Sequence, residues 1–375
     1  RQDNVLMKKN KILYIISNIA CKSRVSSSVM NYYRRIDHKK FQIDFLLFKK
    51  YDESYEKELV ENGSNIYYLN SKYSIFDYFN IKKEIKHFFK RHKYDIVELH
   101  SPTLSYLVAD QLDKFNVPNR IIHTHSTIMS SNVVKNLINH ILNFNCLKYF
   151  NVYFSCSSKS GSYWYNNQII NSDKYFLILN GIDLTKYKHD DDKGESIRKK
   201  LNIKNNKTVA FVGRMSKDKN ISFLSKIVKS TIDKDKNIKF IFIGDGNELN
   251  KLKNSTKKYN NNVIFLGLRN DVNELLSAFD MVILPSKREG MPMVLIEAQA
   301  TGVTCIASDT ITQEANIGLV SFVPLIKDKW VEAILSAKMN ADIDESRINR
   351  QKFDIQNCTK ELEKIYIDLF KGSEV

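Results

Sequence analysis

The sequence lacks an apolar run long enough to cross a lipid bilayer. A membrane-spanning helix needs about 18 or more consecutive apolar residues, and no stretch of these 375 residues reaches that length. The opening stretch, RQDNVLMKKNKILYIIS, also lacks the long hydrophobic segment and the small-residue cleavage site of a signal peptide. We therefore expect neither a membrane span nor a leader. The residues before Met7 are either a native extension or an addition, and Lys8 to Lys11 lead into a strand.

Cysteine is scarce, and its pattern excludes two kinds of site. The five cysteines are odd in number and far apart, and they contain no C-x-x-C pair, which argues against both a disulfide framework and a zinc site. The pattern predicts reduced thiols, as in a cytoplasmic protein. The cysteines are Cys21, Cys146, Cys156, Cys305 and Cys358.

Acidic residues are too few to balance the basic ones, and the net charge is +16. The first 187 residues hold 27 lysines and arginines against 16 aspartates and glutamates, and the remainder holds 31 against 26. A basic face favours an anionic partner, such as a membrane surface or a phosphorylated substrate. The alternative is an ordinary solvated surface in a sequence rich in lysine and asparagine. No zinc-finger, RRM or P-loop spacing is present, so we expect no nucleic acid.

Short apolar runs alternate with longer amphipathic segments throughout the chain. A hydrophobic fraction of 43% allows 375 residues to pack two domains of roughly 150 to 200 residues each. Several runs are apolar throughout, which is typical of parallel strands covered on both faces. This alternation predicts an α/β fold of two Rossmann-like, doubly wound domains. The predicted strands are residues 12–16, 41–48, 66–69, 96–99, 120–124, 152–155, 176–179, 209–212, 238–243, 263–266, 281–284, 304–307 and 322–325.

A polar, charged and turn-rich stretch, residues 180–207, separates the two series of strands and predicts a linker. We expect an N-terminal, acceptor-side domain in residues 1–185 and a C-terminal, nucleotide-sugar-binding domain in residues 186–355. Residues 356–375 are predicted to form a helix that packs back toward the first domain. The apolar face of this helix comprises Leu362, Ile365, Tyr366 and Leu369.

The stretch PSKREGMPMVLIEAQATG, residues 285–302, has the pattern of an anion-binding turn. It follows a predicted strand, Gly290 and Pro292 shape a turn, and Pro292 suits the first position of the helix MVLIEAQA. The free N–H groups and the dipole of that helix favour a phosphate. Glu289 before the helix and Glu297 inside it are expected to point into the crevice at the carboxyl ends of the strands, holding a hexose and a ribose. The alternative is a surface loop followed by an ordinary helix.

Three further stretches follow strands of the same predicted sheet. In GRMSKDKN, Arg214 and Lys219 would neutralise a diphosphate and stabilise it as a leaving group. In FIFIGDGNEL, the glycines around Asp245 permit a close approach of the backbone to a ligand. In LGLRNDV, Arg269 lies beyond a third strand. Each feature alone is also typical of a solvated surface or an ordinary turn, and their convergence at one edge of the sheet is what favours a site.

Histidines follow two predicted strands of the first domain. His123 and His125, in RIIHTHST, alternate along one strand and should face the same side, and His100 ends another strand in ELHSP. A neutral imidazole there can hydrogen bond to a hydroxyl group. The alternative is that these histidines are structural.

At this order and spacing, EGMPMVLIEAQATG, GRMSKDKN, GDG and LGLRNDV resemble the retaining family-4 glycosyltransferases. NYYRRID, HTHST and LNGID in the first half are similar to the bacterial exopolysaccharide and capsule members. The resemblance covers nearly the whole chain and implies the GT-B fold, in which two Rossmann-like domains face a cleft.

The resemblance also implies roles for individual residues. Glu289 would hold the donor sugar, Glu297 the nucleotide ribose, and Arg214 and Lys219 the diphosphate, while His125 contacts the transferred sugar. The backbone near Arg269 would contact the base. The implied donor-binding residues are Gly244, Asp245, Gly246, Arg269, Gly290, Met291, Pro292, Met293, Val294 and Glu297; the implied sugar or acceptor side holds His100, His123 and Arg24.

One loop departs from the family pattern. The first strand–helix loop usually carries a Gly-Gly pair close to the donor phosphates, whereas NIACKSRVSSSVM has Ser23–Arg24 at that place and no glycine. Side chains would obstruct the close approach, or Arg24 would supply a cation instead. The departure puts the phosphate contacts of this loop in doubt.

These observations together predict a retaining, metal-independent glycosyltransferase without a cofactor. It would move a hexose or N-acetylhexosamine from a nucleotide-diphosphate sugar, most simply UDP-linked, to a glycan, lipid-linked or polysaccharide acceptor. Three alternatives stay open: a non-catalytic partner subunit that binds glycan or protein, a hydrolysing sugar-nucleotide epimerase of similar fold, and a plain polyanion-binding protein.

Two segments are candidates for contact with the inner face of a membrane. NIKKEIKHFFKRHK, residues 80–93, combines Ile81, Ile85, Phe88 and Phe89 with lysines, as in a basic amphipathic helix that lies on an anionic leaflet. The alternative is a helix that covers a sheet. NVVKNLINHILNF, residues 132–144, is ambiguous in the same way.

Overall fold

The computed structural model describes residues 9–71, 77–127, 133–143, 145–337 and 349–372. The chain divides into two compact units: unit 1 comprises Arg1–Gly181 with Ile355–Val375, and unit 2 comprises Ile182–Asp354. The sequence had suggested boundaries after residues 185 and 355. The start of the chain as far as Met7 lies outside the described residues, as do both ends of the segment 132–144.

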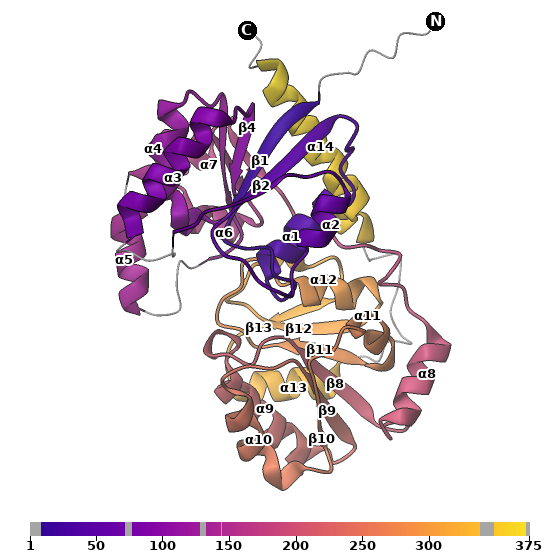
Figure 1. Ribbon diagram of the computed structural model, residues 1–375. Coiled ribbons are helices and arrows are strands. Elements are labelled where there is room, and N and C mark those ends of the chain that lie inside the picture. Colours follow the sequence, from indigo (N-terminus) through magenta and orange to yellow (C-terminus); the bar gives the residue numbers. More distant parts are fainter. Residues whose placement is uncertain (1–8, 72–76, 128–132, 144, 338–348, 373–375) are drawn as a thin grey trace, which may run out of the picture. The chain divides into compact units, whose positions relative to one another are not determined.

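Unit 1 contains one parallel sheet in the order β3-β2-β1-β4-β5-β6-β7 (Figure 1). The first strand of the chain lies inside the sheet, and the order reverses beside it, which is the arrangement of a doubly wound nucleotide-binding fold. The strands are β1 Asn10–Ile16, β2 Phe41–Leu47, β3 Ile66–Tyr68, β4 Ile96–Leu99, β5 Asn119–Thr124, β6 Val152–Ser155 and β7 Tyr175–Leu177.

Unit 2 repeats this plan with six parallel strands in the order β10-β9-β8-β11-β12-β13. The strands are β8 Lys207–Val212, β9 Ile238–Ile243, β10 Val263–Gly267, β11 Met281–Leu284, β12 Thr304–Ser308 and β13 Val320–Val323. The predicted class, α/β with two doubly wound parallel sheets, is confirmed. The prediction of the last strand was wrong by two residues, because Pro324 lacks an N–H group and the strand ends before it.

Helices cover both faces of each sheet (Figure 1). Unit 1 has α1 Arg24–Tyr33, α2 Glu56–Glu61, α3 Tyr78–Arg91, α4 Ser105–Lys114, α5 Val133–Asn143, α6 Ser158–Trp164, α7 Asn167–Ile170 and α14 Ile355–Gly372. Unit 2 has α8 Asp191–Lys200, α9 Ile221–Lys234, α10 Leu249–Thr256, α11 Val272–Leu275, α12 Met293–Ala300 and α13 Lys327–Ser336.

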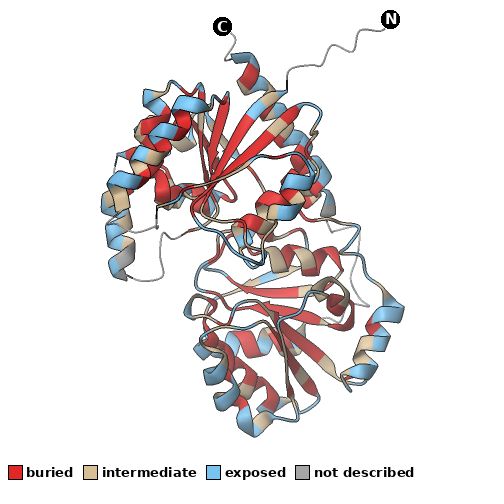
Figure 2. Ribbon diagram, viewed as in Figure 1, coloured by how far each residue is buried: buried red, intermediate tan, exposed pale blue. Residues whose placement is uncertain are grey.

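Strand β1 shows why its residues form a central strand. Its last five residues are apolar and nearly inaccessible to solvent, and side chains alternate between the two faces of a strand. Ile12 and Tyr14 pack with α1 and α14 on one face, whereas Leu13 and Ile15 pack with α3 and α4 on the other. The strands of both units are mainly buried, and the outer faces of the helices are exposed (Figure 2).

The last helix, α14, belongs to unit 1 although it follows unit 2 in the sequence. The hydroxyl groups of Tyr366 on α14 and Tyr14 on β1 are 2.8 Å apart and both buried. Of the residues expected on its apolar face, Leu362 and Tyr366 are buried, while Ile365 and Leu369 pack partly buried against the same core.

The two candidate membrane helices differ in burial. Helix α3 buries Ile81, Ile85, Phe88 and Phe89 in the core, so its apolar face covers the sheet and is not available to a membrane. Helix α5 exposes the large apolar side chains of Val134, Leu137, Ile138 and Ile141. Within the described part of the chain, no helix is both long enough and apolar enough to span a bilayer.

Candidate functional site

The loops that follow β8, β9 and β10 are joined through their backbones at the carboxyl edge of the unit 2 sheet. Gly213 N–H donates to Ile243 at 2.9 Å, Met215 N–H donates to the Asp245 carbonyl at 2.8 Å, and Gly244 N–H donates to Gly267 at 2.7 Å. Because β8, β9 and β11 are neighbours in the sheet, the stretches predicted to form the site lie together.

Gly244 and Gly246 are glycines for a reason that the sequence did not reveal. A Cβ at Gly244 would lie 2.1 Å from the carbonyl oxygen of Gly213, and one at Gly246 would lie 2.3 Å from that of Met215. Both residues also have positive φ angles, 129° and 153°. The close approach is therefore between two loops of the protein. A ligand contact at this place stays a prediction.

Lys219 and Glu289 form a buried ion pair. Lys219 ends a short 3₁₀ helix after β8, Glu289 lies in the loop between β11 and α12, and the Lys219 ammonium contacts the Glu289 carboxylate. Each residue is only 5% exposed. The sequence assigned these residues to a diphosphate and a sugar, and the structure brings them together. A buried charge needs a partner, so each side chain holds the other in place.

The two predicted arginines differ in their surroundings. Arg214 is exposed directly beside Gly213. Arg269 makes a two-pronged hydrogen bond with the carboxylate of Asp271, at 2.8 and 2.5 Å, and this pair is also exposed. The guanidinium of Arg269 is therefore paired within its own turn. The contact with the base that the resemblance implies would be made by the backbone near Arg269.

The turn before α12 spans Gly290, Met291 and Pro292, and both Met291 and Pro292 are buried. Pro292 is the residue before the helix, with ψ at 84°, and α12 begins at Met293. The prediction that Pro292 occupies the first helical position was therefore wrong by one residue, since this ψ is not helical. Met293 and Val294, which open the helix, are partly exposed, and no side chain caps them.

Glu297 has a partner that sequence reasoning missed. The Tyr187 side chain lies near the Glu297 carboxylate. Burial raises the pKa of Glu297, and the nearby Tyr187 hydroxyl offsets part of this rise. Burial and the nearby carboxylate raise the pKa of Tyr187 as well. The available signal was an aromatic residue inside the otherwise polar stretch TKYKHDDD, which was assigned to the linker.

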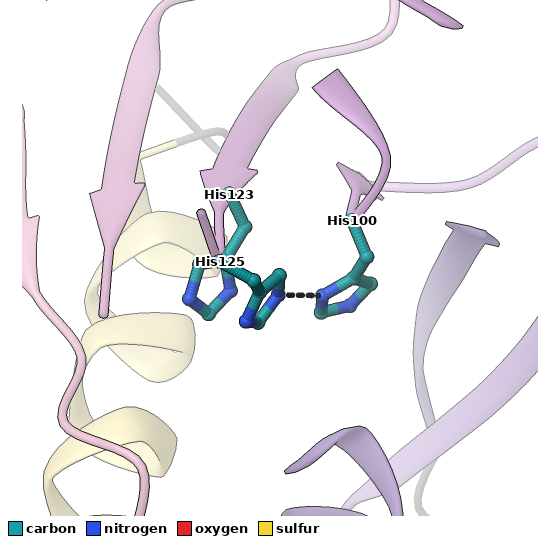
Figure 3. A group of neighbouring side chains, drawn as sticks. All are labelled: His100, His123 and His125. Carbon is teal, nitrogen blue, oxygen red and sulfur yellow. Dashed lines mark hydrogen bonds between the residues drawn. The ribbon is translucent and has the colours of Figure 1, made fainter. Parts of the chain in front are cut away.

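In unit 1, His100, His123 and His125 gather at the carboxyl ends of β4 and β5 (Figure 3). His123 and His125 lie on the same side, with ring centroids 4.1 Å apart. His100 Nδ1 and His125 Nε2 are 3.2 Å apart, within hydrogen-bond distance. Burial lowers the pKa of His100 and of His123 to about 3, and lowers that of His125 as well. The three imidazoles are therefore neutral near pH 7.

Glu98 is a second residue that the sequence reasoning missed. It lies 1% exposed in β4, accepts a hydrogen bond from Tyr366 on α14, and has Oε1 2.7 Å from His123 Nδ1. Burial raises its pKa. An acidic residue inside the apolar strand IVEL was the signal that could have identified it.

His100 and His125 line a pocket of about 440 Å³ in unit 1, together with Ser17, Lys49 and Ser101. In the loop that lacks Gly-Gly, Ser23 accepts a hydrogen bond from Ser26 N–H and so caps α1. Arg24 is exposed and is not among the lining residues. A larger hollow of about 750 Å³ between β3 and α3 contains none of the predicted site residues.

Comparison with known proteins finds a family to which part of unit 2 is similar. Residues 193–317 match the family "Glycosyl transferases group 1". A putative glycosyltransferase, EpsF of Bacillus subtilis, is 26% identical, covering 88% of each chain. The capsular polysaccharide biosynthesis glycosyltransferase CapH of Staphylococcus aureus is 26% identical, covering 83% of this chain and 86% of that protein.

Two further similarities bear on the ligands of relatives. An Escherichia coli enzyme named UDP-Gal:alpha-D-GlcNAc-diphosphoundecaprenol alpha-1,3-galactosyltransferase is 31% identical, covering 59% of each chain. The structure of Anabaena HepE in complex with UDP is 16% identical, covers 96% of this chain and 100% of that one, and superposes with a TM-score of 0.74. The same protein has been solved with UDP-glucose. The resemblance to bacterial capsule and exopolysaccharide glycosyltransferases is thus confirmed.

Proposed function

We propose that this chain, a glycosyltransferase with a group 1 domain, transfers a hexose or N-acetylhexosamine from a UDP-sugar with retention of configuration. The acceptor would be a glycan, a lipid-linked sugar or a cell-surface polysaccharide. The observation that carries the proposal is the buried Lys219–Glu289 pair at the carboxyl edge of the unit 2 sheet, within the region that matches the family. Ligands of open α/β sheets bind at this edge.

The donor diphosphate would be bound by Arg214, by Lys219 and by the uncapped N-terminus of α12. Lys219 lies against the backbone of Gly213, where a Cβ would be 3.6 Å from its Cε. Glu289 would accept hydrogen bonds from sugar hydroxyl groups while staying paired with Lys219. Glu297, which lies near Tyr187, would accept hydrogen bonds from the ribose hydroxyl groups. The names of the E. coli and Anabaena proteins, which include UDP or a UDP-sugar, support uracil as the base.

The chemistry would rest on positioning and on stabilisation of the departing diphosphate. Cations and helix N–H groups that are already in place cost little reorganisation when negative charge develops on the leaving group. The acceptor would attack from the same face, and the leaving phosphate would accept its proton. This scheme needs no metal ion at the diphosphate and no protein nucleophile.

Unit 1 would supply the acceptor side, through the pocket of about 440 Å³ that His100 and His125 line. His125 is the residue that would contact the transferred sugar. A lipid-linked acceptor requires the enzyme to work at a membrane, and the exposed apolar face of α5 suits the anionic inner leaflet. This face comprises Val134, Leu137, Ile138 and Ile141. The exposed Lys148 follows shortly after the helix and adds positive charge.

Thermal unfolding of the purified chain with a panel of nucleotide sugars and free nucleotides tests the donor site. A ligand that binds only the folded state raises the melting temperature, with a stabilisation of about 2.7 kcal/mol at a hundredfold excess over its Kd. We expect UDP and one UDP-sugar to raise it and the Glu289→Ala variant to lose the sugar-dependent part. A folded chain that responds to no nucleotide would contradict the proposal and favour a non-catalytic partner subunit.

Two assays on the same protein separate the enzyme classes. Proton NMR of the product from a suitable acceptor should show the anomeric configuration of the donor, since transfer proceeds with retention. Release of UDP that needs no acceptor would instead indicate the hydrolysing epimerase. Binding of nucleotide sugar without any turnover would indicate the partner subunit.

A further inference from the structure

The hollow of about 750 Å³ beside β3 is bounded on one side by a row of basic side chains from α3. These residues recur every three or four positions along the helix and therefore lie on one of its faces. They are Lys83, Lys86, His87, Lys90 and Arg91, and all of them are exposed. The apolar residues of α3 form a separate stripe that packs into the core. One face of α3 thus holds the helix on the sheet, and a second face presents positive charge to the hollow.

The positive charge of this basic row is not balanced within the described part of the chain. No carboxylate there forms an ion pair with the three lysines or the arginine of the row, whereas the neighbouring Lys82 pairs with Asp110 at 2.7 Å. Glu84 is the one acidic residue among those that line the hollow. Its carboxylate is occupied, because it accepts hydrogen bonds from the backbone N–H groups of Asn70 at 2.7 Å and Ser71 at 3.0 Å. The row is therefore suited to an anionic partner.

The other side of the hollow is an open edge of the sheet. Strand β3 lies at the end of the strand order and pairs only with β2. The backbones of Asn65 and Leu69 hydrogen bond to β2, at 2.9 and 3.0 Å. Because successive residues of a strand point their backbone groups to opposite sides, Ile66 and Tyr68 point theirs away from β2. No hydrogen bond to these outward groups comes from the rest of the described chain, so the edge can pair with another strand.

Apolar side chains of the core reach the hollow between these two sides. They are Leu46, Tyr67, Leu69 and Phe88. A strand edge, an apolar floor and a charged side wall together suit an extended peptide, which is recognised through its backbone and its alternate side chains. Every second residue of an extended strand advances by about 6.6–6.8 Å, and one turn of a helix advances by about 5.4 Å. Acidic side chains at alternate positions can therefore each lie near a cation on a successive turn of α3.

We propose that an extended acidic segment of a partner protein joins the sheet beside β3 and pairs its carboxylates with the basic row of α3. The charges are spread over about 12 Å of helix between Lys83 and Arg91, which is too long for a single phosphate group. A lipid surface has no use for an open strand edge, and the apolar face of α3 is buried. The alternative is that the lysines only protect the edge from pairing with other chains. All of these residues lie in unit 1, so the inference does not depend on the proposed donor site.

The probe is the fluorescein-labelled peptide Glu-Val-Glu-Val-Glu-Val, and fluorescence anisotropy measures its binding to the full chain. We expect saturable binding of one peptide per chain, weakened by salt because the charge pairs are exposed. Two further peptides, N-methylated either on the three glutamates or on the three valines, test the backbone contacts. Successive N–H groups of an added strand point to opposite sides, so one of the two should bind at least about tenfold more weakly and the other like the parent peptide. Equal binding of all three peptides would overturn the proposal.

A triple variant removes the charge of the basic row and keeps the helix, since glutamine and lysine have similar helix propensities. It combines Lys83→Gln, Lys86→Gln and Lys90→Gln. We expect its affinity for the parent peptide to fall by about tenfold, the combined effect of three exposed charge pairs.

The matched control lowers the net charge by the same amount at three exposed lysines of α14. It combines Lys360→Gln, Lys364→Gln and Lys371→Gln. Circular dichroism checks that both variants are folded. The control should bind the peptide like the unsubstituted chain. Equal weakening in both variants would show that overall charge, and not the row on α3, attracts the peptide, and the proposal would be wrong.

Sedimentation with anionic phospholipid vesicles separates a peptide partner from a membrane. We expect the variant of the basic row to lose peptide binding and to keep the vesicle binding proposed for α5. Loss of vesicle binding together with an unchanged Kd for the peptide would mean that the row contacts a membrane, which contradicts the proposal.

Discussion

Among single residues, Lys219 and Glu289 are under the strongest physical constraint. Removing one partner of a buried ion pair typically costs about 3–5 kcal/mol, because the other charge stays buried without compensation. A donor that binds beside this pair meets a carboxylate whose position is already set by Lys219. The pair therefore links the stability of unit 2 to its proposed function. A substitution that tests the function should keep the size of the side chain.

Glu289→Gln keeps the size of the side chain but removes its charge and replaces one acceptor oxygen with an NH2 donor. We expect transfer from the UDP-sugar to fall by about 10²–10³-fold, the usual effect of removing one group that stabilises a transition state. Turnover is measured as UDP release with acceptor present. Glu332→Gln, an exposed change on α13, is the matched control and should be neutral. Turnover of Glu289→Gln within threefold of the unsubstituted enzyme would refute the assignment.

Gly244→Ala should destabilise unit 2 through a backbone clash. The new Cβ would lie 2.1 Å from the Gly213 carbonyl oxygen, and φ at 129° is unfavourable for alanine. We expect a loss of at least about 2 kcal/mol, measured by urea unfolding.

Gly267→Ala separates the cost of the clash from the cost of a positive φ angle. Gly267 also has a positive φ, 68°, but a Cβ there would have no atom within 4 Å. A cost similar to that of Gly244→Ala would mean that the contact with Gly213 is unimportant.

At the scale of elements, α3 and α5 have similar amphipathic patterns but differ in the burial of their apolar faces. Both helices carry apolar residues at helical spacing, yet α3 inserts its apolar face into the core and α5 leaves four large apolar side chains exposed. Exposed apolar clusters of this kind usually mark an interaction surface. The exposed face belongs to the more basic half of the chain, which is the combination expected at an anionic lipid surface.

The double substitution Leu137→Asp with Ile141→Asp tests this surface of α5. Both side chains are more than 60% exposed, so stability should not change, whereas partitioning onto vesicles with anionic phospholipid should fall at least tenfold. Co-sedimentation with anionic and with neutral vesicles measures the effect. Val60→Asp, at an exposed position on α2, serves as the control. If the double variant sediments like the unsubstituted chain, α5 does not dock on membranes.

At the scale of the whole molecule, the two units share one architecture but carry different side chains at the ends of their strands. Unit 2 gathers the residues that we propose for the diphosphate and the sugar on loops after β8, β9 and β11. Unit 1 gathers neutral histidines and a buried glutamate at the carboxyl ends of β4 and β5, and it closes its own core with α14 from the far end of the sequence. In our proposal, the positive charge that neutralises the diphosphate comes from the side chains of Arg214 and Lys219 in unit 2.

UDP binding should therefore be independent of metal. Calorimetric titration of the full chain with UDP should give the same Kd, within about twofold, with EDTA as with zinc or magnesium, because Arg214 and Lys219 supply the positive charge. Lys219→Ala should weaken UDP binding under each condition. A Kd that rises more than tenfold in EDTA would show that a metal ion takes part in binding the diphosphate.

The sequence by itself determined the fold class and the location of the sites along the chain. Strands covered on both faces must be apolar throughout, so their runs are visible in the sequence, and ligand-binding residues of such folds follow strands. The tertiary structure decided which side chains meet. The pairing of Lys219 with Glu289 and of Tyr366 with Glu98 joins residues far apart in the sequence, and it depends on which strands and helices become neighbours. Packing also decided that α3 is covered and α5 is exposed, because an amphipathic pattern specifies an apolar face without specifying what covers it.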